Sequence, residues 1–291
     1  MKKRKGIILA GGSGSRLHPI TLSLSKHLIP IYDKPMIYYP LSVLMLAGIR
    51  EVCIITTPES QEQYISLLGD GAHWGMMITY VVQSSPDGLA QAYILAEEFL
   101  DEAPSAMVLG DNIFYGSGFT DLLHSANERL VGGTVFGYEV SDPTQYGVVT
   151  LNDDGNPISI EEKPVTLSSN YAVTGLYFLD KDAPKRAKMV KPSKRGELEI
   201  TSLLETYLNE GELNVEIMSR GYAWLDTGTH SNLLDAGNFV KTLQQRQGLQ
   251  VGCPEEIAFN NKWIDSDQLL KLGKTYEKTP YGQYLLRLSK I

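Results

Sequence analysis

The chain has only two cysteines in 291 residues, Cys53 and Cys253, and neither has the neighbours that a metal site requires. A disulfide framework is therefore excluded, and both residues are expected to be ordinary reduced thiols. No apolar stretch approaches the roughly 18 residues of a membrane-spanning helix, and the apolar run after the basic amino terminus ends at Gly11. These absences predict a soluble, cytoplasmic protein with no membrane partner.

Positive charge is also scarce, because 26 Lys and Arg residues face 34 Asp and Glu residues, for a formal net charge of −8. This balance argues against a protein that binds nucleic acid or a membrane surface through a basic face, but a local basic pocket stays compatible with it. Apolar residues make up 43% of the chain and charged residues 21%, which is enough apolar material for a sizeable core. The length fits one large α/β domain or a catalytic domain with an appendage.

The first 110 residues alternate between short apolar or β-branched runs and longer helix-like runs. The expected strands are 6–9, 51–57, 78–83 and 106–109, and the expected helices are 35–47, 59–68 and 89–100. This alternation predicts an α/β fold with a mostly parallel, Rossmann-like central sheet flanked by helices on both faces. Ligands of such sheets bind beyond the carboxyl ends of the strands.

After about residue 134 the pattern changes to closely spaced strands, which predict an antiparallel insertion on the parallel core. These expected strands are 134–140, 147–151, 158–162 and 172–179. The α/β alternation then returns, with helices at 198–209 and 229–246 around a strand at 213–218. The last forty residues have two helix candidates, 266–272 and 281–289, which predict a small C-terminal helical appendage.

The strongest local signal is a glycine-rich segment directly after the first expected strand, Gly11-Gly12-Ser13-Gly14-Ser15-Arg16. Backbone N–H groups of such a loop can surround an anion, and the arginine adds a planar set of donors for phosphate. The loop does not match the dinucleotide pattern G-x-G-x-x-G, because Leu17 stands at the third glycine, and it lacks the Gly-Lys-Ser/Thr of a Walker loop. Lys26 adds a second cation nearby. The alternative is an ordinary strand-to-helix turn with a surface arginine.

Further segments make the resemblance to a known family specific. The segments are GGSGSRL at 11–17, SKHLIP at 25–30, KPMIYYP at 34–40, QSSPDGLAQA at 83–92, LGDN at 109–112, EEKP at 161–164, GELEIT at 196–201 and WLDTGT at 224–229. The chain resembles the bacterial sugar-nucleotide pyrophosphorylases over almost its whole length, and the glucose-1-phosphate thymidylyltransferases in particular. The resemblance implies an enzyme that uses Mg²⁺ to convert dTTP and glucose 1-phosphate into dTDP-glucose and pyrophosphate.

Two aspartates in distant segments are candidates for the metal site. Asp111 follows the apolar run 106–109 and Asp226 follows the apolar segment 222–225, so both carboxylates are expected at strand ends. Mg²⁺ prefers hard oxygen ligands and keeps phosphate oxygens in its shell, which suits this pair. The resemblance makes both residues its ligands. Without the resemblance, each would more simply be an aspartate in a turn at a strand end.

The reaction requires alignment and relief of charge repulsion, and no general base, because the nucleophile is a phosphate oxygen that is mostly dianionic at neutral pH. The resemblance assigns Arg16 to the departing pyrophosphate, Lys163 to the sugar phosphate and Lys26 to the triphosphate. With Asp111 and Asp226 these are the predicted catalytic residues. A bridge between the two substrates' phosphates is the alternative for Lys26. On spacing alone, Lys163 would be an ordinary solvated strand residue.

The resemblance also assigns residues to the two substrates. The residues predicted to bind the nucleotide are Leu9, Gly11, Gly12, Ser13, Gly14, Ser15, Arg16, Gln83, Pro86, Gly88 and Asp111. The residues predicted to bind the hexose are Tyr146, Gly147, Glu162, Lys163, Val173 and Trp224. The Gln83 amide can pair with the N3–H and a carbonyl of thymine at once, whereas Trp224 has core packing as its alternative. One methyl separates thymine from uracil, so measurable use of UTP is expected.

The sequence departs from the family pattern at two positions. Ser15 stands where threonine is frequent, which keeps a hydroxyl. His27 stands where glutamine is common, and a histidine next to Lys26 bears on recognition of the deoxyribose. The alternative for His27 is a surface residue with no role.

The resemblance further implies a homotetramer with an effector site between subunits for dTDP-rhamnose, the end product of the pathway that dTDP-glucose enters. The expected organisation is a catalytic domain at 1–246, with its sugar-binding part at about 134–228, and the appendage at 247–291. Two other functions stay open: the same chemistry with UTP or another hexose phosphate, and a nucleotide-sugar sensor without catalysis. The presence of both Asp111 and Asp226 favours an enzyme, because a pure binder would not need two metal carboxylates.

Overall fold

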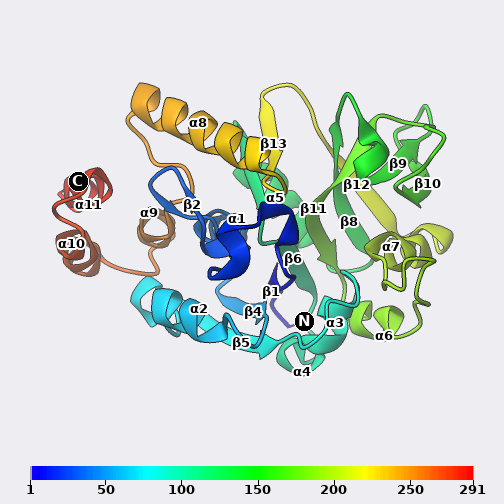
Figure 1. Cartoon of the computed structure of the whole chain (residues 1–291), viewed down its shortest axis with the longest axis horizontal. Helices are drawn as coiled ribbons and strands as arrows, with labels where there is room; N and C mark the ends of the chain where they lie inside the picture. The colour runs from blue at the N-terminus through cyan, green and yellow to red at the C-terminus, as the bar shows by residue number, and fades with distance from the viewer. Residues whose placement is uncertain (1, 291) are drawn as a thin grey trace.

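The protein, analysed as a computed structural model that describes residues 2–290, is built on a nine-stranded sheet with helices on both faces (Figure 1). Four parallel strands lie in the order β5–β4–β1–β6. Their bounds are β1 Lys5–Ala10, β4 Glu51–Thr56, β5 Met77–Val82 and β6 Ser105–Leu109. All four correspond to predicted strands.

The second half of the chain extends the same sheet. Strand β11 pairs antiparallel with β6, β8 and β9, β9 pairs antiparallel with β10, and β12 pairs parallel with β8. Their bounds are β8 Gly133–Glu139, β9 Gly147–Leu151, β10 Pro157–Glu162, β11 Tyr171–Leu179 and β12 Leu213–Met218. The predicted antiparallel strands are thus hydrogen-bonded to the central sheet, and the α/β class with a mostly parallel sheet is confirmed.

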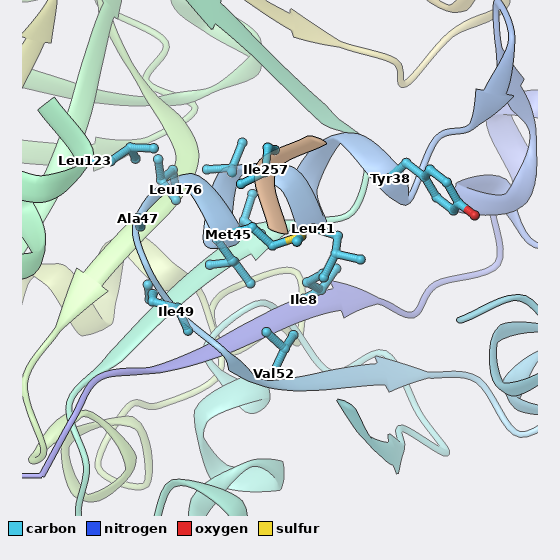
Figure 2. Close-up of a cluster of buried hydrophobic side chains, with 14 of the residues drawn as sticks. Ile8, Tyr38, Leu41, Met45, Ala47, Ile49, Val52, Leu123, Leu176 and Ile257 are labelled. Carbon is cyan, nitrogen blue, oxygen red and sulfur yellow. The ribbon is translucent and has the colours of Figure 1, made fainter. Parts of the chain in front are cut away.

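Alternate residues of the central strands face two separate hydrophobic cores, as the two-residue period of a strand requires. Ile8 belongs to one core, with α1 (Tyr38–Leu46) and α5 (Phe119–Glu128), whereas Ile7 belongs to the other, with α3 (Gln91–Leu95). Figure 2 shows the first core, in which Leu41 and Met45 of α1 lie beside Ile8. The remaining helices that flank the sheet are α2 Gln61–Leu68, α4 Glu97–Leu100, α6 Ala183–Ala187 and α7 Ile200–Asn209. Helix α8 His230–Gln247 packs instead against the short strands β2 and β13 and forms a smaller hydrophobic cluster with them.

The carboxyl-terminal segment forms three helices, α9 Pro254–Asn260, α10 Ser266–Thr275 and α11 Pro280–Leu288. Helix α9 packs against α1 through Ile257, so this segment is joined to the central core, while α10 and α11 pack on each other at the end of the molecule far from α6 and α7 (Figure 1). A domain boundary at residue 246 stays a prediction. Within residues 2–290, the structure has no helix of the length and hydropathy needed to cross a membrane.

A separate two-stranded antiparallel ribbon joins β7 (Asn112–Gly116) to β13 (Tyr222–Asp226). Two residues separate the end of β6 from the start of β7, and the last residue of β13, Asp226, pairs with the first residue of β7, Asn112. A second, shorter ribbon pairs β2 (Pro30–Ile31) with β3 (Lys34–Pro35). The β7–β13 ribbon therefore brings a segment more than 100 residues away to the carboxyl end of β6.

Candidate active site

A cavity of about 530 Å³ opens at the carboxyl ends of the parallel strands β1 and β6, where Leu9 and Leu109 line its floor. Every residue predicted to bind the nucleotide, the hexose or the metal lines this one cavity. It is also lined by several residues that were not assigned to a substrate or a metal from the sequence, among them Leu17, Asn112, Gly175, Tyr177 and Thr201. The structure thus brings the candidates together, while their individual roles stay predictions.

The glycine-rich loop forms one wall of the cavity. Gly12 and Gly14 have φ angles of 94° and 59°, which lie in the left-handed region that favours glycine. The loop is held in place by the fully buried Leu17 and by Thr21, whose hydroxyl donates to the Gly14 carbonyl at 2.8 Å. Arg16 stays exposed, so its guanidinium is available at the cavity mouth. The glycine-rich loop and the Arg16 cation thus line the cavity, and anion binding by this wall stays a prediction.

Asp111 follows β6 and forms an ion pair with Lys26. Asn112 also donates to the Asp111 carboxylate, at 2.9 Å. Burial by itself raises the pKa of Asp111, but the positive charge of Lys26 and these hydrogen bonds outweigh it and lower the pKa below the ordinary value. Asp111 is therefore held as a carboxylate.

Asp226 is brought next to Asp111 by the β7–β13 ribbon, in which Asp226 is the partner of Asn112. Burial and then the negative charge of Asp111 raise the pKa of Asp226, against the opposing effects of Lys26 and Arg16. The two carboxylates thus repel one another across a partly buried gap.

These two aspartates fit a divalent cation that also binds phosphate. In the part of the chain that the structure describes, no three His, Cys, Asp or Glu side chains are placed to hold a metal ion. A closed, all-protein site is therefore not formed, whereas Mg²⁺ typically uses one or two carboxylates together with water and substrate phosphates. A cation between Asp111 and Asp226 would relieve the repulsion that raises the pKa of Asp226.

The end of the cavity that is predicted to bind the hexose is lined by polar and aromatic groups in or next to β9, β10 and β13. Glu162 Oε2 accepts from the Thr201 hydroxyl at 3.2 Å, and Glu162 Oε1 accepts from Arg195 at 3.2 Å. Burial, and then the charge of Glu199, raise the pKa of Glu162. Lys163, directly after β10, has a φ of 44°, a strained conformation for a residue with a side chain. Thr201 and Arg195 were not identified from the sequence.

Trp224 has its orientation fixed by a hydrogen bond from its indole nitrogen to Asn112 Oδ1 at 2.6 Å. The same oxygen accepts from the Gly175 N–H at 3.1 Å. The Tyr146 and Trp224 rings lie 5.0 Å apart between centroids, at an interplanar angle of 60°. Trp224 is only partly buried and lines the cavity, so core packing is not its only role.

His27 is buried, with 4% of its surface exposed, so the alternative of a surface histidine is wrong. Its Nδ1 lies 3.3 Å from the Tyr64 hydroxyl, and a Cβ added to Gly110 would come within 2.7 Å of its ring. Burial lowers the pKa of His27 to about 4, which keeps the ring neutral at pH 7. His27 therefore supports the turn that carries Asp111.

The chain is similar to proteins of one enzyme family. Residues 5–242 match the family model described as nucleotidyl transferase. A protein of Xanthomonas campestris pv. campestris named glucose-1-phosphate thymidylyltransferase is 60% identical over 290 residues, which cover 100% of this chain and 98% of that protein. A Mycobacterium tuberculosis protein of the same name is 53% identical over 284 residues, which cover 98% of each chain.

Two solved structures resemble the protein in three dimensions. One is named as a glucose-1-phosphate thymidylyltransferase of Bacillus anthracis in complex with sucrose. It has a TM-score of 0.74 and 41% identity, and the match covers 81% of this chain and 94% of that one. The other, a UDP-glucose pyrophosphorylase complexed with UDP-glucose, has a TM-score of 0.72 at 24% identity, covers 83% and 99% of the two chains, and shows the shared fold alone.

Proposed function

The chain belongs to the nucleotidyl transferase family and, within it, to the glucose-1-phosphate thymidylyltransferases, and we propose on this basis that it forms dTDP-glucose and pyrophosphate from dTTP and glucose 1-phosphate. An oxygen of the sugar phosphate attacks the α-phosphorus in line, the bond from that phosphorus to the bridging oxygen of the β-phosphate breaks, and pyrophosphate leaves. The observation that supports this most directly is that one cavity is lined by the glycine-rich loop, by both aspartates and by the polar residues around Glu162.

The triphosphate would lie along the glycine-rich loop. Backbone N–H groups of residues 11–15 would donate to its oxygens, and Arg16 would hold the β- and γ-phosphates and stabilise the pyrophosphate as it departs. Lys26 would reduce the charge near the α-phosphate, because it lies beside Asp111 at the centre of the cavity. Gln83 and the backbone at Gly88 would bind the base.

Asp111 and Asp226 would hold Mg²⁺ together with phosphate oxygens of the nucleotide. The ion, when bound, neutralises phosphate charge and so makes the α-phosphorus accessible to another anion. Lys26 and Asn112 keep Asp111 ionised and fix its orientation, so this carboxylate is ready to bind a cation at neutral pH. Asp226 would lose its proton more readily once the cation offsets the charge of Asp111.

Glucose 1-phosphate would bind between the Tyr146–Trp224 pair and Glu162. The Glu162 carboxylate would accept hydrogen bonds from sugar hydroxyls and Gly147 would offer its N–H, while Trp224 and Val173 would form the apolar wall. The Lys163 ammonium nitrogen lies 3.9 Å from Glu162 Oε1. Lys163 would hold the sugar phosphate against the α-phosphorus. The residues supply alignment and charge neutralisation, the two effects that a reaction between anions needs most.

The finer points of this proposal rest on the resemblance. The product would enter synthesis of dTDP-rhamnose and related dTDP-sugars, the enzyme would assemble as a homotetramer, and dTDP-rhamnose would act as an effector between subunits. Loss of turnover on addition of dTDP-rhamnose, and the mass of the particle in solution, are the measurements that test these points.

Pyrophosphate release by the purified protein is the decisive experiment. We expect release from dTTP that depends on both glucose 1-phosphate and Mg²⁺, with dTDP-glucose as the second product. UTP should also react, because a methyl-sized contact discriminates by only about 1–3 kcal/mol. A preference for dTTP beyond about a thousandfold over dUTP, which differs from dTTP by the methyl alone, would contradict this argument. Absence of release with every nucleotide and hexose 1-phosphate pair would favour the sensor instead.

A further inference from the structure

The amide of Gln83, the residue that we assign to the base, is hydrogen-bonded to a second glutamine. Gln83 is buried, with 5% of its surface exposed, and its Nε2 donates to Gln91 Oε1 at 2.6 Å. Gln91 is the first residue of α3. The other polar atom of the Gln83 amide, Oε1, faces Gly11, where an added Cβ would lie 2.1 Å from it. This amide therefore has one atom engaged by the protein and one directed to the cavity wall.

Asp87 fixes which way the Gln91 amide points. Gln91 Nε2 donates to Asp87 Oδ2 at 2.9 Å, and Gln91 Oε1 accepts from the Asp87 backbone N–H at 3.1 Å. A carboxylate at neutral pH can only accept and a backbone N–H can only donate. If the Gln91 amide were reversed, its oxygen would face the Asp87 carboxylate and its NH₂ group would face the Asp87 N–H, and neither contact could be a hydrogen bond. The Gln91 atom that faces Gln83 must therefore be the oxygen.

The same reasoning fixes the Gln83 amide in turn. Because Gln91 offers Gln83 only an acceptor, Gln83 must turn its NH₂ group toward Gln91, and its Oε1 is left as an acceptor at the cavity. The second N–H of this amide has no hydrogen-bond partner among residues 2–290. This edge matches a ring N–H next to a carbonyl, as in thymine and uracil, and opposes cytosine, which has a ring acceptor next to an amino group. Guanine shares the thymine pattern, so size must exclude it.

We propose that Gln91 and Asp87 are positioning residues that lock the Gln83 amide in one orientation and so make the base subsite select thymine and uracil over cytosine. The proposal rests on the function proposed above, in which Gln83 binds the base. Neither Gln91 nor Asp87 needs to touch the nucleotide. Their effect is on specificity, because an unlocked Gln83 amide could turn over and accept the cytosine pattern.

The test compares the wild type with Gln91→Met, a variant of similar length without a strong acceptor. Steady-state kinetics would be measured with dTTP, dCTP and dUTP. We expect the wild type to prefer dTTP over dCTP by about a hundredfold or more in kcat/KM. In the variant, this ratio should be at least about tenfold lower. The loss should come from a raised KM for dTTP with kcat little changed. The dTTP to dUTP ratio should stay constant, because both bases present the same edge.

A double variant provides the rescue. Gln91→Glu combined with Asp87→Asn keeps an acceptor toward Gln83 and a hydrogen bond between positions 87 and 91, with donor and acceptor exchanged. We expect its dTTP to dCTP ratio to return close to that of the wild type. An unchanged ratio in Gln91→Met, or a double variant as unselective as Gln91→Met, would overturn the proposal. So would a dTTP to dUTP ratio that falls as much as the dTTP to dCTP ratio.

Calorimetric binding of the same three nucleotides, without glucose 1-phosphate, separates this inference from the proposed function. If the wild type binds dTTP selectively over dCTP and Gln91→Met does not, the inference stands even where no hexose phosphate is turned over. If turnover occurs as proposed but Gln91→Met binds the nucleotides with wild-type selectivity, the inference about Gln91 and Asp87 is wrong, whereas the proposed function stands.

Discussion

The Trp224 indole nitrogen donates to Asn112 Oδ1 at 2.6 Å, and Asn112 donates to the Asp111 carboxylate at 2.9 Å. One buried side chain thus connects Trp224, in the part of the cavity proposed to bind the hexose, to the carboxylate of Asp111. The connection runs within the β7–β13 ribbon, because Asn112 is the first residue of β7 and Trp224 lies in β13.

Replacement of Asn112 by alanine should therefore disturb both halves of the site. The Trp224 indole and the Gly175 N–H would lose their shared acceptor, and we expect unfolding free energy to fall by about 1–3 kcal/mol. The KM for glucose 1-phosphate should rise as Trp224 becomes free to turn. Urea unfolding and steady-state kinetics measure the two effects. Asn209→Ala, at an exposed position, is the control and should change stability by no more than about 0.5 kcal/mol.

Asp226→Asn should reduce kcat by at least about a hundredfold, because it removes one of the two carboxylates assigned to the metal. Its stability should not fall, because the substitution also removes a charge that Asp111 repels. Pyrophosphate release and thermal unfolding test these expectations together. Asp235→Asn, on the exposed side of α8, is the matched control and should keep normal turnover. Near-normal turnover of Asp226→Asn would contradict the metal assignment.

The raised pKa of Asp226 predicts how the stability of that variant depends on pH. A carboxyl whose folded pKa is raised contributes stability that is fully present below the unfolded value, about 3.9, and is lost as pH rises through the folded pKa. Asp226→Asn should therefore become more stable relative to the wild type from pH 4 toward neutral pH. Addition of Mg²⁺ at pH 7 should narrow this difference, because only the wild type gains a bound cation. Thermal unfolding across pH, with and without Mg²⁺, measures both effects.

Gly11→Ala should impair nucleotide binding while it leaves the fold intact. The added Cβ would lie 2.1 Å from Gln83 Oε1, at the movable end of that side chain, so Gln83 would have to shift. We expect the KM for dTTP to rise about tenfold with little change in melting temperature. Gly237→Ala in α8 is the control, since an added Cβ there has no neighbour closer than 3.8 Å. Equal effects of the two substitutions would contradict this reasoning.

His27 should make the wild type sensitive to acid. Burial lowers its pKa from 6.5 to about 4, so the neutral ring contributes stability that is fully present above pH 6.5 and is lost as pH falls toward 4. The change corresponds to up to about 3 kcal/mol. His27→Gln cannot take up this proton, and its unfolding free energy should vary less over that range. If the unfolding free energies of the two proteins fell in parallel with pH, a group other than His27 would be the main cause of the acid sensitivity.

The alternation of apolar and amphipathic segments predicted the parallel strands and most of the helices that cover them. Strand β7, helix α6 and helix α9 were not predicted. Residues 112–116 follow β6 after only two residues, too closely for a separate strand to be distinguished, and α6 and α9 are only five and seven residues long. Helix α5 was also missed, although Phe119, Leu123 and Ala126 recur at helical spacing and are buried.

Most residues that line the cavity were predicted from the sequence, because they lie in recognisable motifs. The contacts between these residues were not predicted. That Asp226 stands beside Asp111 depends on the register of a ribbon that joins segments more than 100 residues apart. The lock on Gln83 depends on an α3 side chain that meets a loop aspartate. Burial of His27 depends on packing against Gly110 and Tyr64. Each of these is a tertiary contact, and such contacts leave no periodic pattern in the sequence.

The β7–β13 ribbon has no ladder hydrogen bonds to the nine-stranded sheet, although its two strands carry Asn112, Trp224 and Asp226. Asn112, Ile113 and Phe114 of β7 are buried, whereas all five residues of β13 are only partly buried. Strand β13 should therefore open at a lower free energy than global unfolding. A one-residue slip between its strands would turn Asp226 to the opposite face. Heat or denaturant should thus abolish catalysis before the central sheet unfolds, and amide hydrogen exchange should be faster in residues 222–226 than in β1.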